Sequence, residues 1–96
     1  MAKDLSGINE YPHSDTSSSV TGAEVLTIDP GRASLVLVYI DASDGGTLAV
    51  GTGGAAVPIA GEQWVTAWTP GPTSQRASTI SVTPTTGSTD IHFRVH

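Results

Sequence analysis

Residues 78–96, STISVTPTTGSTDIHFRVH, decide the fold class of this chain. In the segment 76–83, Ser78, Ile80 and Val82 fall on one side of the chain and the intervening residues on the other. The segment 90–96 alternates in the same way, with Ile91, Phe93 and Val95 on one side and His92, Arg94 and His96 on the other. A side-chain period of two is that of a half-buried β-strand, so these residues predict two strands joined by a loop at 85–88.

The same pattern continues toward the N-terminus, where turn signals separate short strands. The run 35–40 is apolar at every position, which predicts a central strand covered on both faces. The turn Asp44-Gly45-Gly46 follows it, and we expect a hairpin with the strand at 47–50. Pro58 places the strand at 55–60 on a sheet edge. The count is about seven strands, which predicts an all-β fold: a small antiparallel β-sandwich of jelly-roll type, or a barrel.

The first 19 residues differ from the rest, because they are polar and show no clear period between Ser14 and Ser19. Such a stretch buries too little apolar surface to offset the entropy of ordering its backbone. We therefore expect an extended N-terminal arm at 1–19 and a β-domain at 20–96. The arm is either a frayed tail or a segment that orders on a neighbouring subunit. Its anchors in the second case are Leu5, Ile8 and Tyr11.

Composition excludes several classes of protein. The chain has 96 residues, a formal charge of −5 and no Cys, so it is one domain without a disulfide or thiolate metal site. Its acidity argues against nucleic acid as a partner. A domain of this size without a disulfide or a structural metal has a small core, and small domains of this kind often rely on oligomerisation for stability. The sequence therefore predicts a homo-oligomer.

Targeting signals are missing from the first 20 residues, which contain no apolar run of the kind that a secretory signal needs. The longest apolar run, at 35–40, has the length of a strand and is far too short to cross a bilayer. We expect a protein that is not exported by a signal peptide, has no membrane partner and is assembled in the cytoplasm.

Trp64 and Trp68 are the largest side chains. At i and i+4 on one strand they share a face about 13 Å apart. They form either part of the core or of a subunit interface, or a flat aromatic platform for a sugar or a partner protein.

No other residues form a convincing chemical site. His92 and His96 share a strand face, but at this spacing they are too far apart to bind one ion. The segment 41–46 resembles only the start of a calcium loop, because the later Gly and the twelfth-position Glu are missing, and a hairpin turn explains both Asp and both Gly without a metal. No nucleophile turn and no phosphate loop occur. We expect no metal, no cofactor and no enzymatic activity.

The polar segment MAKDLSGINEYPHSDTSSS, the turn segments DPGR, DASDGG and TPGPTS, and the alternating C-terminal end together resemble small structural proteins of tailed bacteriophages, especially capsid cement or decoration proteins. The likeness covers the whole chain in style, not in motif, so no functional positions are carried over. It implies a virion protein, often a homotrimer, that binds the major capsid protein or another virion protein between capsomers on the capsid exterior. Phage neck and tail-fibre proteins share the same style.

The leading hypothesis is therefore a capsid cement or decoration protein that stabilises the capsid. A carbohydrate- or receptor-binding β-sandwich module that uses Trp64 and Trp68 is the first alternative. A subunit of a cellular adhesion or assembly system is another.

Overall fold

The computed structural model describes residues 2–7, 10–71 and 77–96, and strands are its regular elements. The described residues form nine strands: β1 (Ala2–Asp4), β2 (His13–Val20), β3 (Glu24–Thr27), β4 (Val36–Ile40), β5 (Gly46–Val50), β6 (Val57–Ile59), β7 (Trp64–Trp68), β8 (Thr79–Pro84) and β9 (Thr89–Val95). No helix occurs in this part of the chain. The all-β prediction is confirmed, with nine strands in place of about seven.

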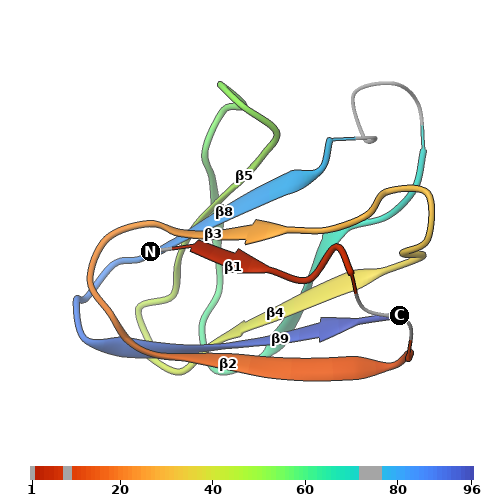
Figure 1. Cartoon of the computed structure of the whole chain (residues 1–96). Coiled ribbons are helices and arrows are strands. Elements are labelled where there is room, and N and C mark those ends of the chain that lie inside the picture. Colours follow the sequence, from red (N-terminus) through yellow and green to blue (C-terminus); the bar gives the residue numbers. More distant parts are fainter. Residues whose placement is uncertain (1, 8–9, 72–76) are drawn as a thin grey trace.

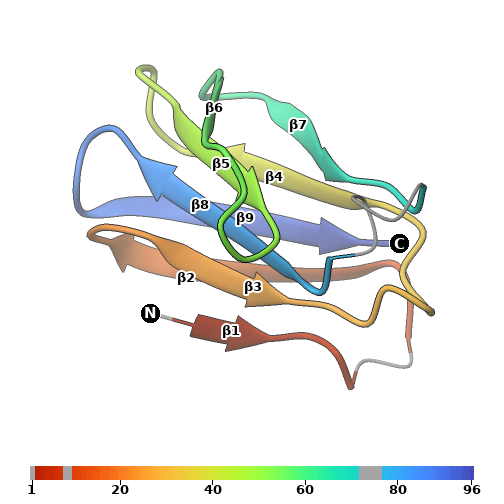
Figure 2. The same cartoon turned by 90° about the horizontal axis from the view of Figure 1, so that it is seen from above.

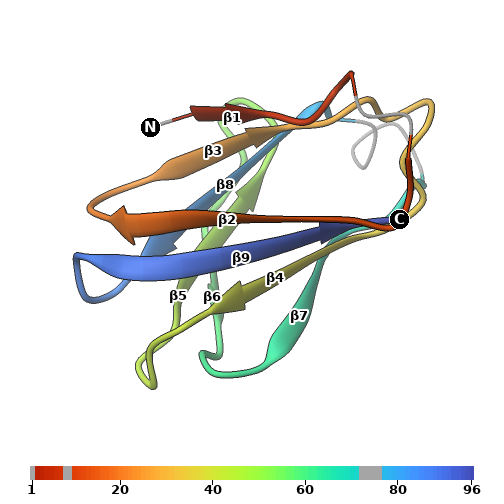
Figure 3. The same ribbon diagram turned by 60° about the horizontal axis from the view of Figure 1, so that its bottom comes forward.

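The strands form two sheets that lie in two layers (Figure 1). The five-stranded sheet has the order β1-β3-β8-β5-β6, and the four-stranded sheet has the order β2-β9-β4-β7. All pairs are antiparallel except β1 with β3. Strand β6 is an edge strand, as Pro58 predicted. Figure 2 and Figure 3 place β6 and β7 on the side of the molecule away from β1.

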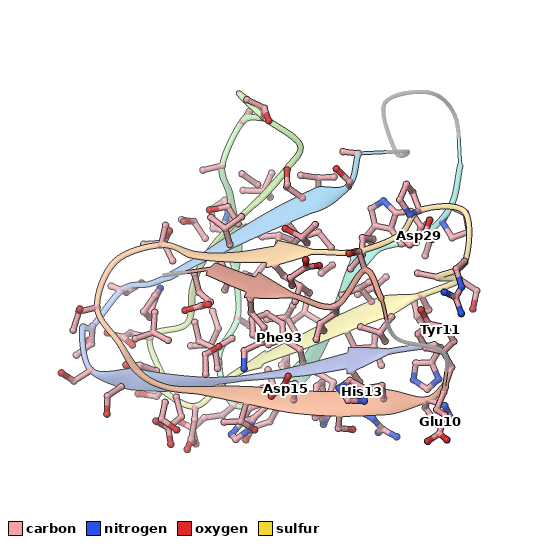
Figure 4. All side chains as sticks on the ribbon, viewed as in Figure 1. Glu10, Tyr11, His13, Asp15, Asp29 and Phe93 are labelled. Carbon is pink, nitrogen blue, oxygen red and sulfur yellow. The ribbon has the colours of Figure 1, made fainter. Side chains whose placement is uncertain are left out.

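The core lies between the two sheets and follows from the alternation in the sequence. In β9, Ile91, Phe93 and Val95 are buried, while His92 and Arg94 point outward and are partly exposed. Figure 4 shows Phe93 between the layers. The opposing sheet contributes further buried aliphatic side chains: Leu26, Leu48, Ile80 and Val82. Contact between the two inner faces is the main source of stability for a fold of this kind.

Most consecutive strands lie in different sheets, and this corrects the predicted hairpin between 35–40 and 47–50. Strand β4 pairs with β7 and β9, whereas β5 pairs with β6 and β8. The turn after β4 therefore carries the chain from one sheet to the other. This turn packs tightly against the connection between β6 and β7. A Cβ on Gly61 in that connection would lie 1.7 Å from the carbonyl oxygen of Ala42, so only glycine fits at position 61.

Strand β4 is central in its sheet, as predicted, but only one of its faces is fully covered. Val36, Val38 and Ile40 are buried, whereas Leu37 and Tyr39 on the other face are partly exposed. The expectation of cover on both faces is therefore not met for the described residues. The outer face of the four-stranded sheet is therefore partly exposed.

The structure also corrects the extended N-terminal arm predicted at 1–19, within residues 2–7 and 10–19 that it describes. Strand β1 pairs with β3, and β2 pairs with β9 along most of its length. The side chain of Leu5 is only 4% exposed and belongs to the core of the same chain. Polar composition does not predict this pairing, because the backbone hydrogen bonds of the two sheets satisfy the polar groups of a Ser-rich strand that buries little apolar surface.

A salt bridge joins the two layers at the edge formed by β1 and β2. Lys3 Nζ lies 3.0 Å from Asp15 Oδ1 and also donates a hydrogen bond to the backbone oxygen of Thr16. Burial alone would raise the pKa of Asp15. Hydrogen bonds from Lys3 and from the Thr16 backbone N–H, with the charges of Lys3 and His13, outweigh it and hold that pKa below its usual value.

Candidate functional site

The outer face of the four-stranded sheet carries a row of four large or polar side chains, one from each strand. Strand pairing sets Thr16 beside His92, His92 beside Tyr39, and Tyr39 beside Trp64. Tyr39 and His92 lie between core-facing residues on their strands, and the register places Trp64 and Thr16 beside them, so these four side chains share the outer face. The register of the sheet thus gathers residues that are far apart in sequence.

The aromatic rings of this row contact one another. The ring centroids of Tyr39 and Trp64 are 5.5 Å apart with the planes tilted by 57°, and those of Tyr39 and His92 are 5.7 Å apart in an edge-on arrangement. Tilted and edge-on pairs at these distances are mutually stabilising. At the far end of the row, Thr16 Oγ1 and His92 Nδ1 form a 2.9 Å hydrogen bond, which fixes the orientation of the imidazole.

Arg94 supplies the positive charge of this face. It is the outward residue two positions after His92 on β9, and its guanidinium carbon lies 5.6 Å from the centroid of the Trp64 ring. A cation at this distance is attracted by the ring face. The Nε atom of Arg94 is buried and has no hydrogen-bond partner within the described residues, so the ring contact is the interaction that holds this end of the side chain.

A depression of about 410 Å³ lies on this face, lined by Tyr39, Asp41, Trp64 and His92. We call these four residues the aromatic depression. Trp64 is 43% exposed, which leaves much of the indole free. The depression combines aromatic surface with a carboxylate and an imidazole, and such a mixture is typical of sites for small polar ligands with some apolar surface.

A β-bulge in β7 separates the two tryptophans and corrects the predicted shared face. One step along β4, from Leu37 to Val36, corresponds to two steps along β7, from Thr66 to Trp68. The extra residue reverses the alternation, so Trp64 points outward while Trp68 is 1% exposed and lies in the core. Of the predicted platform pair, only Trp64 is available to a ligand.

The three predicted arm anchors have different positions. Leu5 is buried in the core of its own chain, and Tyr11 is partly buried and packs against that core. Ile8 lies outside the described residues. Leu5 therefore serves the fold of this chain, which corrects its assignment as a contact to a partner subunit, whereas the assignment of Tyr11 stays a prediction.

A second exposed surface is the part of the β5–β6 hairpin that follows β5, residues 51–60, which consists of the loop and β6. The loop projects from the upper layer in Figure 1, and residues 52–58 are all exposed. The segment has no charged residue, and Val57, Pro58 and the Ala residues at 55, 56 and 60 make it strongly apolar. Val57 is 56% exposed. We call residues 51–60 the apolar hairpin.

Tyr39 and the register that pairs it with Trp64 and His92 were not found by sequence reasoning. Tyr39 lies in an apolar run that indicated a strand buried on both faces. One signal was available: Leu37 and Tyr39 alternate with Val36, Val38 and Ile40, which are β-branched. This alternation separates two faces of the strand, but it neither says which face is exposed nor names the neighbouring strands.

Other features of the described residues add no site. A second depression, of about 520 Å³, is lined by Pro30, Gly31, Pro70 and Gly71, whose side chains carry no hydrogen-bonding group. The described residues contain no cluster of three or more metal-ligating side chains. They also form no helix long and apolar enough to span a membrane. Comparison of the chain with protein-family models, with curated proteins and with solved structures gave no match.

Proposed function

We propose that this protein is a non-enzymatic structural component of a virion, of the capsid cement or decoration type, which docks on a protein surface through the apolar hairpin. The observation that carries the proposal is the exposure of an uncharged, projecting segment in a chain of net charge −5. Such apolar surface is a recurrent feature of protein interaction sites. The sequence resembles small phage capsid proteins in style, and this resemblance is the reason for proposing a capsid as the assembly.

The edge position of the hairpin favours contact through side chains over strand addition. Strand β6 pairs with β5 only and has a free edge within the described part of the chain. It is three residues long, and Pro58 at its centre has no N–H to donate to an added strand. A partner surface with a shallow apolar groove therefore fits this hairpin better than a second β-strand does.

The small size of the hairpin suits a protein that acts in many copies. Val57 and the neighbouring Ala and Pro side chains offer a modest apolar area, so each contact is weak. Many weak contacts on one particle combine through multivalency into stable attachment. Self-association into a homotrimer, the oligomer that the resemblance implies, increases this effect and is part of the proposal.

Co-sedimentation with capsids tests the proposal. The wild-type protein is expected to sediment with capsids of the phage that encodes it, and Val57→Asp is expected to remain in the supernatant, because a carboxylate cannot enter an apolar groove without a partner. Thr21→Asp is the matched control, since Thr21 is exposed and the charge change is the same. A wild-type protein that is a monomer by ultracentrifugation and has no affinity for the particles would refute the proposal, as would full binding by Val57→Asp.

A further inference from the structure

The aromatic depression is not used by the proposed assembly contact. It belongs to the outer face of the four-stranded sheet, whereas the apolar hairpin belongs to the five-stranded sheet. Its two large aromatic side chains come from neighbouring strands that the register places side by side. A structural role in the core does not explain them, because the depression is open and Trp64 is 43% exposed.

The rings of Tyr39 and Trp64 provide the apolar surface of the depression. Their planes are tilted by 57°, so this surface is angled and not flat. The C–H face of a pyranose ring is apolar and rigid, and it packs well on an aromatic ring. Arg94 at the Trp64 ring already supplies a cation there, which disfavours a second cation as the ligand.

The polar groups beside the rings fit hydroxyl groups. Asp41 is exposed at the end of β4, and its carboxylate accepts hydrogen bonds. His92 is held by Thr16 through Nδ1, and within the described residues no hydrogen bond occupies its Nε2 atom. The two groups together offer an acceptor and an oriented ring nitrogen to neighbouring hydroxyls, which is the pairing that sugar recognition needs.

We propose that the aromatic depression binds a pyranose residue of a glycan, with the sugar ring on Trp64 and Tyr39 and its hydroxyl groups on Asp41 and His92. The volume of about 410 Å³ lies within the range of small-ligand pockets and suits one sugar residue with part of a neighbour. The negative net charge and the carboxylate of Asp41 disfavour acidic sugars. The ligand class is therefore a neutral glycan, bound weakly at each site. This function is additional to the assembly role and does not depend on it.

Nuclear magnetic resonance tests the proposal directly, because the chain has two tryptophans, of which Trp64 lies in the depression and Trp68 in the core. The probes are the methyl glycosides of glucose, galactose, mannose and N-acetylglucosamine at millimolar concentration. At least one of them is expected to shift the indole N–H signal of Trp64 while leaving that of buried Trp68 in place. The Trp68 signal also reports that the fold is retained in each variant.

Substitutions of the two aromatic residues then test whether their rings contact the sugar. Trp64→Ala and Tyr39→Ala are each expected to weaken binding about tenfold, the size of effect that loss of one ring contact gives. Trp64→Phe keeps an apolar ring and is expected to restore most of the affinity. Gln63→Ala is the matched control, because Gln63 is an exposed neighbour of Trp64 that does not line the depression.

Two results would overturn the proposal. One is a Trp64 signal that none of the four glycosides moves. The other is a Trp64 signal that moves with tetramethylammonium and with no sugar, which would make the two rings a cation site. Because sugar binding is observed at Trp64 and particle binding by sedimentation of Val57→Asp, the two proposals fail independently of each other.

Discussion

Replacement of Leu5 by alanine tests whether the N-terminal segment belongs to the fold. Leu5 follows β1, its side chain is 4% exposed in the core, and its backbone N–H donates a 2.7 Å hydrogen bond to the oxygen of Thr27. The hydrogen bond is unaffected by the substitution. The variant therefore removes the side-chain contact alone and measures how much the segment contributes through packing.

The expected loss follows from the buried carbon atoms. Leu→Ala removes three carbons, and at about 0.8 kcal/mol for each the free energy of unfolding falls by about 2.4 kcal/mol. Because β1 is an edge strand, it can move inward and reduce the cavity, so the additional cavity cost is small. With an unfolding entropy of about 2.1 cal/mol/K for each of the 96 residues, this loss lowers Tm by about 12 °C.

Thermal and urea unfolding, followed by circular dichroism and by tryptophan fluorescence, measure this change. Val57→Ala is the control, because it also truncates an aliphatic side chain but at a position that is 56% exposed, where the expected change is below about 0.5 kcal/mol. If the two variants unfold at the same temperature as each other and as the wild type, the burial of Leu5 carries no energy. Residues 2–7 then behave as an arm, and the reasoning is refuted.

Two further predictions concern the core and the layer edge. Trp68→Ala is expected to lower the free energy of unfolding by about 3–5 kcal/mol, while Trp64→Ala lowers it by less than about 1 kcal/mol; equal losses in urea unfolding would contradict the opposite orientations of the two rings. The folded-state pKa of Asp15 is depressed, so its bridge to Lys3 stabilises the fold above the unfolded value of about 3.8 and is lost as the pH falls through the lower folded value. Both side chains are partly exposed, so Lys3→Met is expected to cost less than about 1 kcal/mol at neutral pH and nothing in strong acid; a cost that persists in acid would assign the effect to packing of the Lys3 side chain.

The alternation of side chains allowed much of the fold to be predicted, because it reports directly which residues face the core. Ile80, Val82, Ile91, Phe93 and Val95 are buried as their period indicated. What alternation does not contain is the identity of the neighbouring strand. The turn after β4 has the residues of a hairpin turn, yet it joins two sheets, because close packing of its glycines against another connection sets its path.

The N-terminal strands could not be predicted for a related reason. The polar residues of β2 give no periodic apolar signal, and Ser17 and Val20 are its only buried side chains. The strand is held mainly by backbone pairing with β9, whose own pattern is strong. A strand of this kind depends on its partner, and such dependence is visible only once the pairing is known.

The two tryptophans show how one inserted residue places one ring in the core and the other on the surface. Without the bulge in β7, residues four apart on a strand share a face, and Trp64 and Trp68 would both be outside or both be inside. With it, Trp68 fills the core and Trp64 stands beside Tyr39 on the open face. The core then retains its large aromatic side chain whatever replaces Trp64. The outer face can therefore change its side chains without loss of the fold, as the sugar site that we propose there requires.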